Sequence, residues 1–145
     1  MGIPNPFSDI LKGKGYEVFN THGEDLDLQP ETVKQYENID FVTALEICEH
    51  LINPMGVLSA LPCNKLVASI PLSLWFAKAY RSNSDPWDRH FHEFEDWQFD
   101  WLLEKSGWKV MDSEKWTSPT GQLGIRPFLR KITPRYYIVY AERSL

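Results

Sequence analysis

The sequence predicts one α/β domain with a mostly parallel sheet that is flanked by helices and ends in an antiparallel strand. Short apolar runs of strand-forming residues alternate along the chain with segments whose apolar residues recur at helical spacing. Such alternation is typical of a parallel sheet covered by helices on both faces. The last two strand-like segments have no helix between them, so they are expected to pair as a hairpin. A chain of 145 residues suffices for one domain with its own core.

The first half of the chain combines strand-like and helix-like segments. We expect helices at residues 8–12, 29–38 and 47–61 and strands at residues 16–20 and 40–45. Gly13 or Gly15 would end the first helix, and Pro30 suits the first turn of the second. Asn53-Pro54 would break or restart the third helix.

The second half continues the alternation. We expect strands at residues 65–71, 108–111 and 136–142, a helix at residues 95–106, and loops at residues 72–87 and 117–134. The helix is supported by Phe94, Trp97 and Trp101, which recur at three- and four-residue intervals, and Gly107 would stop it. The segment 117–134 holds three prolines and two glycines, which favour a long loop.

Charge and composition narrow the expected partners and compartment. The formal net charge is −5 and there is no basic block, which argues against duplex nucleic acid. No run of 18 apolar residues is present, so no membrane partner is expected. The two cysteines, Cys48 and Cys63, suggest reduced thiols, and a cytoplasmic protein is predicted.

The segment 39–54, IDFVTALEICEHLINP, is the most informative part of the chain. An apolar strand passes abruptly into Glu46, Glu49 and His50, which places ionisable groups at the carboxyl edge of a sheet, where open α/β folds bind ligands. The string resembles the fourth strand and following helix of class I S-adenosylmethionine-dependent methyltransferases of the type 11/23-like kind. Residues 101–110 and 136–142 resemble the end of that domain, so the resemblance spans most of residues 16–142. It implies a Rossmann-like fold, S-adenosylmethionine as cofactor, and a small-molecule methyl acceptor of small or medium size.

The resemblance also implies a cofactor site. The segment from His22 to Leu26 is similar to a family segment whose first acid contacts adenine, a position that His22 holds here, with Glu24 or Asp25 able to serve if the loop shifts. A turn in which Asp25 caps its own backbone is the competing interpretation. The expected cofactor-binding residues are His22, Gly23, Glu24, Asp25, Ala44, Leu45 and Glu46.

Catalytic and acceptor contacts are expected close to the same edge. His50 follows Glu46 by four residues, so both would share a helix face, and the resemblance implies that His50 acts as a base on a substrate hydroxyl. Trp75, Tyr80 and His90 are the expected substrate-binding residues, although the aromatic side chains would equally fill a core. His90 and His92, taken with Cys48 and His50, lack finger-like spacing, so no metal site is predicted.

Two family motifs have no counterpart in the chain: the glycine-rich loop after the first strand and the acid that ends the second. The sequence therefore predicts an N-terminally incomplete domain. Residues 16–20 would be the third strand of the family or, alternatively, the second; the spacing to residues 40–45 favours the third. A catalytically inactive module that binds a partner protein is the alternative function, and a homo- or hetero-oligomer would cover the open sheet edge.

Overall fold

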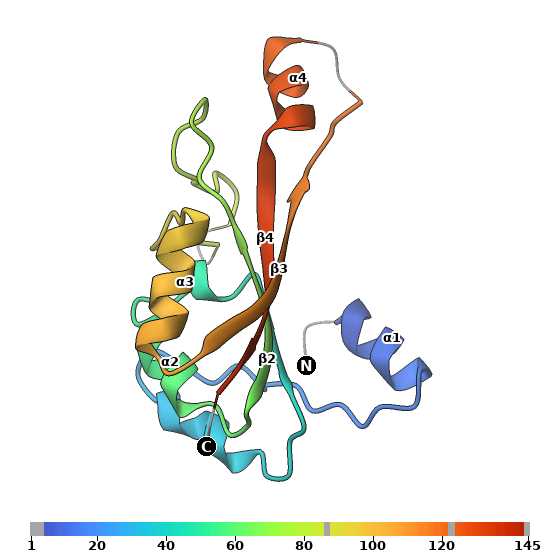
Figure 1. Ribbon diagram of the computed structural model, residues 1–145, viewed down its shortest axis with the longest axis vertical. Helices are drawn as coiled ribbons and strands as arrows, with labels where there is room; N and C mark the ends of the chain where they lie inside the picture. The colour runs from blue at the N-terminus through green and yellow to red at the C-terminus, as the bar shows by residue number, and fades with distance from the viewer. Residues whose placement is uncertain (1–4, 86–87, 122–123, 144–145) are drawn as a thin grey trace.

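A four-stranded mixed sheet forms the centre of the protein, whose computed structural model describes residues 5–85, 88–121 and 124–143 (Figure 1). The strands are β1 (Val42–Leu45), β2 (Lys65–Pro71), β3 (Lys109–Thr117) and β4 (Pro134–Glu142), in the spatial order β1-β2-β4-β3. β1 pairs with β2 in parallel, whereas β4 is antiparallel to both β2 and β3. Three strands therefore run one way and β4 the other, which confirms the predicted fold class and the C-terminal hairpin.

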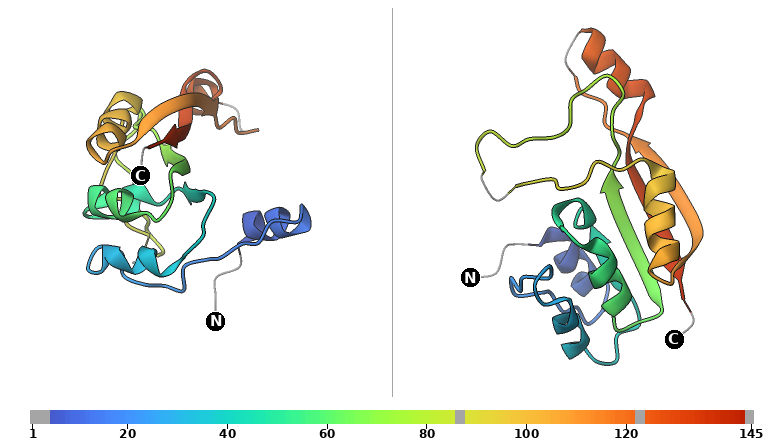
Figure 2. Two further views of the ribbon diagram at one scale, coloured as in Figure 1. Left: turned by 60° about the horizontal axis from the view of Figure 1, so that its bottom comes forward. Right: turned by 90° about the vertical axis from the view of Figure 1, so that its left-hand side faces the viewer.

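One face of the sheet carries the core. Helices α2 (Pro54–Ala60) and α3 (Asp96–Lys105) lie against this face, while α1 (Pro6–Gly13) is set apart on the other side (Figure 2). Alternate residues of the central strands are fully buried beneath the two helices: Leu66, Ala68 and Ile70 of β2, and Tyr137, Val139 and Ala141 of β4. Burying one such large apolar side chain contributes about 1.5–3 kcal/mol.

The opposite face of the sheet is only half buried. Strand register places Leu45, Ser69 and Ile138 on this face, next to Tyr136 and Trp116. Trp116 belongs to β3, an edge strand whose residues are almost all exposed. The second face thus presents a partly apolar surface beside the carboxyl ends of β1 and β2.

Local sequence signals explain where the two core helices begin. Asn53 caps α2 by accepting the N–H of Gly56 at 3.1 Å, and Pro54 occupies the first helical position. Glu95 and Gln98 form a capping box at the start of α3, in which the Glu95 N–H donates to Gln98 Oε1 at 2.9 Å.

The helix expected at 47–61 is two helices: the 3-10 turn η2 (Cys48–His50) and then α2. The break falls at Asn53-Pro54, because the residue before a proline avoids the helical conformation.

The strand expected at residues 16–20 is absent; this segment is irregular. Its residues serve other contacts: Asn20 accepts from the Ser8 hydroxyl at 2.7 Å and from the Tyr36 hydroxyl at 3.2 Å. The Tyr16 ring packs edge-on against Phe41, with centroids 6.2 Å apart. A strand forms only where it can pair with a neighbouring strand, and residues 16–20 have no such neighbour in the part of the chain that the structure describes, despite their alternating polarity.

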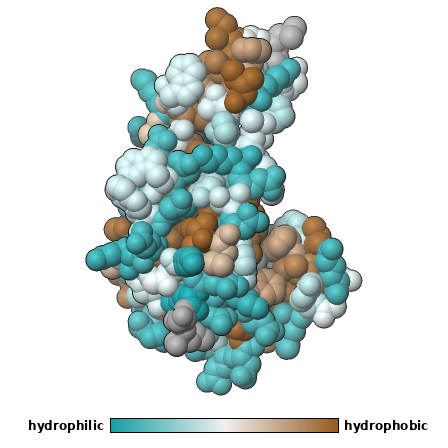
Figure 3. Space-filling view, viewed as in Figure 1, coloured by the Kyte–Doolittle hydropathy of each residue, from teal (hydrophilic) through white to brown (hydrophobic). Residues whose placement is uncertain are grey.

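The prediction of a loop at residues 117–134 is also wrong. The segment contains helix α4 (Ile125–Ile132). The paired strands β3 and β4 extend away from the rest of the protein as an arm, and α4 lies at its tip (Figure 1). Pro127 lies in the first turn of α4, where proline is tolerated. Ile125, Phe128 and Ile132 remain exposed on this tip, visible as an apolar region in Figure 3. β3 extends to Thr117, beyond the expected 108–111, because the ladder with β4 pairs its polar residues.

The short 3-10 helix η1 (Pro30–Gln35) begins at Pro30 as expected and packs against α2. Among the described helices, none has the length and apolar character that crossing a membrane requires.

Candidate functional site

Glu46 stands at the carboxyl edge of the sheet, as predicted. It follows β1 directly, and its N–H donates to the Ser69 carbonyl of β2 at 3.0 Å. Its backbone has φ of 54°, in the left-handed region that costs a residue with a side chain about 1–2 kcal/mol. The Ser69 hydroxyl donates to Glu46 Oε1 at 2.9 Å, which holds the carboxylate over the strand ends. Strain of this kind is retained where the surrounding structure fixes it, commonly at functional sites.

A hollow of about 390 Å³ lies beside Glu46 on the half-buried face of the sheet. Its walls are mostly apolar, and it is lined by Leu45, Glu46, Ser69, Trp116, Tyr136 and Ile138. Burial raises the pKa of Glu46, and the Ser69 hydrogen bond and the charges of Arg135 and His50 oppose that rise. The site therefore offers an acidic group at the rim of an apolar recess.

A second group of side chains forms around η2. Glu49 and His50 come from η2 itself, and His90 comes from a loop 40 residues further along the chain. The Glu49 carbonyl accepts the N–H groups of Phe91 at 2.7 Å and His92 at 3.3 Å, so the backbone after His90 is attached to η2. One potential ligand atom from each of Glu49, His50 and His90 lies within 4.8 Å of the others.

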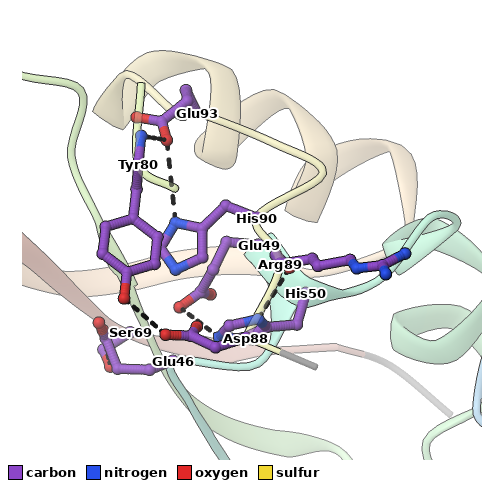
Figure 4. A network of polar contacts seen from close by, with 9 residues as sticks. All are labelled: Glu46, Glu49, His50, Ser69, Tyr80, Asp88, Arg89, His90 and Glu93. Atoms are coloured by element: carbon purple, nitrogen blue, oxygen red, sulfur yellow. Dashed lines mark hydrogen bonds and ion pairs between the residues drawn. The ribbon is translucent and has the colours of Figure 1, made fainter. Parts of the chain in front are cut away.

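The Nδ1 atom of each imidazole in this group faces a polar group (Figure 4). His50 Nδ1 lies 3.0 Å from the Arg89 carbonyl, which only accepts, so Nδ1 carries the proton. The free Nε2 of His50 then lies 3.7 Å from Glu49 Oε1. His90 Nδ1 lies 3.8 Å from Glu93 Oε1, and its other ring nitrogen points toward the Glu49 carboxylate.

Tyr80 supports His90 from the opposite side. Its ring packs on the imidazole with centroids 4.3 Å apart, its N–H donates to Glu93 Oε1 at 2.7 Å, and its hydroxyl donates to Asp88 Oδ2 at 2.5 Å. An open hollow of about 640 Å³, lined by loop residues between Tyr80 and Phe91, adjoins His90. The structure thus brings together the predicted residues His50, Tyr80 and His90.

Glu49 was not among the cofactor-binding, catalytic or substrate-binding residues predicted from the sequence. Its side chain is only 1% exposed, and within the described part of the chain its Oε2 has no hydrogen-bond partner. Burial raises the pKa of Glu49 to about 7, and the charges of Glu46, Asp88 and Glu93 add to this effect. Its signal in the sequence was weak: a glutamate beside a histidine, inside a segment otherwise rich in apolar residues.

The predicted adenine-binding segment makes mostly local contacts. Glu24 accepts from the His22 N–H at 2.6 Å and from Gln35 Nε2 at 3.0 Å. Asp25 Oδ1 accepts two backbone N–H groups, those of residues 27 and 28, each at 3.1 Å, which is the self-capping turn weighed as the alternative. Gly23 has φ of 94°, and a Cβ there would meet nothing within 4 Å, so its backbone conformation is what favours glycine.

The remaining predicted site residues lie apart from the Glu49 group. Trp75 is 76% exposed and packs edge-on against Phe76 with centroids 5.3 Å apart. Ala44 packs against the core beneath the helices, whereas Leu45 lines the hollow beside Glu46. Their expected roles in binding cofactor and acceptor remain predictions.

Comparison with known proteins identifies the fold. No protein-family model matches the sequence, and no curated protein matches it either. Among solved structures, it is similar to a SAM-dependent methyltransferase from Archaeoglobus fulgidus, with a TM-score of 0.63 and 18% identity over 94% of this chain and 80% of that chain. The [4+2]-cyclase SpnF matches with a TM-score of 0.49 and 13% identity, over 94% of this chain and 61% of that chain. The chain therefore shares the fold of this methyltransferase.

Proposed function

We propose that the protein is an S-adenosylmethionine-dependent methyltransferase that acts on a small or medium acceptor. The observation that carries the proposal is the pairing of a strained, half-buried Glu46 with an apolar hollow at the carboxyl edge of a methyltransferase fold. In open α/β folds this edge is the ligand-binding edge.

The residues at the strand ends fit the cofactor. When bound, S-adenosylmethionine supplies an activated methyl group on a cationic sulfonium. The Glu46 carboxylate, fixed by Ser69, would attract that positive charge, and Leu45 with its apolar neighbours would receive uncharged parts of the molecule. In this proposal His22, Gly23, Glu24 and Asp25 approach the adenine. Glu24 and Asp25 are already engaged in local hydrogen bonds, so they would contact it only after the loop moves.

His50 is suited to receive a proton from the acceptor. Its Nδ1 proton is held by the Arg89 carbonyl, which leaves Nε2 as the accepting nitrogen. Imidazole is the side chain that most often serves as a general base. In this proposal the acceptor contacts Tyr80 and His90, which border the open hollow beside His50. It also contacts Trp75, whose side chain is largely exposed. The remaining contribution of the protein is to align the two reactants.

Calorimetric titration with S-adenosylmethionine and with its demethylated product tests this proposal directly. We expect saturable binding to the full chain, and weaker binding to Glu46→Gln, because the carboxylate charge is lost while the shape is kept. Glu104→Gln is the matched control, because Glu104 is exposed on α3, away from the strand ends. Absence of binding at millimolar cofactor would reject the proposal and favour a catalytically inactive module. Equal affinity of Glu46→Gln and Glu104→Gln would remove Glu46 from the site.

A further inference from the structure

We propose that Glu49, His50 and His90 bind a divalent transition-metal ion. The three side chains supply two imidazole nitrogens and one carboxylate oxygen, and these atoms lie within 4.8 Å of one another. Ligand bonds to such ions are about 2.0–2.2 Å long, so small side-chain rotations would bring all three atoms onto one ion. Two histidines and one carboxylate on one side of an ion leave positions open for other ligands.

The buried carboxylate is the strongest single indication of a ligand. Glu49 is 1% exposed, and its Oε2 has no hydrogen-bond partner among the described residues. A buried carboxylate oxygen without a partner is strongly disfavoured unless something compensates it. Figure 4 shows this carboxylate facing the two imidazoles, so a cation placed among the three groups would satisfy the oxygen.

The outer contacts of the histidines are those that metal ligands usually have. His50 donates its Nδ1 proton to the Arg89 carbonyl at 3.0 Å, and His90 Nδ1 lies 3.8 Å from the Glu93 carboxylate. The hydrogen bond to Arg89 fixes the tautomer of His50 and raises the basicity of the nitrogen that faces the ion. At 3.8 Å the Glu93 carboxylate acts on His90 through its charge and not through a hydrogen bond.

The local charge also favours a cation. Glu46, Asp88 and Glu93 each act electrostatically on Glu49, and all three are carboxylates. Arg135 opposes them with a positive charge that acts on both Glu46 and His90. A divalent ion would neutralise part of this excess of negative charge.

The donor atoms select the class of ion and indicate the class of substrate. Imidazole nitrogens suit Zn²⁺, Cu²⁺, Fe²⁺ or Ni²⁺ better than Mg²⁺, Ca²⁺ or Mn²⁺, which prefer oxygen. Open positions on the ion would bind a hydroxyl oxygen of the methyl acceptor; this point rests on the proposed function, whereas ion binding does not. Once the ion is bound, His50 Nε2 is a ligand, so its proposed role as a base belongs to the metal-free protein.

Titration of the untagged, metal-free protein with Co²⁺ tests the site without S-adenosylmethionine. We expect one ion per chain and visible absorption bands from the bound Co²⁺. His90 lies in a surface loop, and His90→Ala, which removes a ligand, should weaken Co²⁺ binding at least about 100-fold. Glu93→Gln should weaken it by about 10–100-fold, because groups that contact a ligand from outside typically have effects of that size. His92→Ala is the matched control, because His92 stacks on Phe94 in the same loop and should leave affinity unchanged.

Nitrogen NMR of the imidazole rings provides a readout independent of folding and activity. With diamagnetic Zn²⁺, the Nε2 resonances of His50 and His90 should shift, while those of His22 and His92 should not. No saturable Co²⁺ binding at millimolar concentration, equal losses in His90→Ala and His92→Ala, or shifts at all four histidines would each overturn the proposal. Because no cofactor is present, a failed S-adenosylmethionine titration would leave this result intact.

Discussion

Arg143, which directly follows β4, donates hydrogen bonds to the end of α2, and replacing this side chain is expected to destabilise the fold. Its guanidinium donates to the carbonyls of Ser59 and Cys63 at 3.1 Å and to that of Leu61, and it lies 4.4 Å from the centroid of the Trp108 ring. It therefore satisfies carbonyl groups at and just beyond the end of α2, where no intrahelical donor is available.

The magnitude of this effect follows from those contacts. A hydrogen bond from a charged group contributes about 1.5–3 kcal/mol and a cation–π contact about 0.5–1 kcal/mol. Because Arg143 is partly exposed, water would replace some of the lost hydrogen bonds, so we count only one of them in full. Arg143→Ala should thus lower the free energy of unfolding by about 2–4 kcal/mol. Arg143→Lys should lower it by a large part of that amount, because lysine lacks the planar fork.

Urea denaturation followed by circular dichroism measures the loss as a shift of the midpoint at constant slope. Arg130→Ala is the control, since Arg130 lies on α4 at the tip of the arm, far along the sheet from α2 (Figure 1). A loss below about 1 kcal/mol in Arg143→Ala, or one equal to that of the control, would refute the reasoning.

Two further predictions concern Glu46 and Cys63. Since Glu46 has φ of 54°, Glu46→Gly should be more stable than Glu46→Ala by about 1 kcal/mol in the same urea assay, and equal stability would show that the left-handed conformation carries no cost. Burial raises the pKa of the Cys63 thiol, whose Sγ–H donates to the Lys65 carbonyl at 3.2 Å. The contribution of Cys63 to the free energy of unfolding should therefore be constant below the unfolded thiol pKa of about 8.5 and decrease as pH rises above it, because only the unfolded thiol ionises there. Cys63→Ala should reduce this decrease relative to the parent protein; an unchanged pH dependence would contradict the assignment.

Much of the fold was predictable because its elements carry local patterns. The strand at residues 65–71 and the helix at residues 95–106 were placed almost to the residue, since apolar periodicity and caps are encoded within the segments themselves. Residues 16–20 and the helix α4 were predicted wrongly for two different reasons. A strand needs a neighbour to pair with, and α4 lies in a segment whose prolines and glycines also suit a loop.

The candidate site was predictable only in part. The position of Glu46 at the carboxyl edge followed from an apolar strand that ends in charge. The role of Glu49 did not, because its burial and its unpartnered oxygen depend on which residues pack around it.

By itself, then, the sequence determined the order of the elements from β1 through α2, β2 and α3 to β3, and the placement of charged residues just after β1, because both are properties of neighbouring residues. The approach of His90 to Glu49 and His50 was decided only by tertiary structure. It requires the Glu49 carbonyl to bind backbone N–H groups of Phe91 and His92, more than 40 positions away, and no local periodicity encodes such a long-range contact.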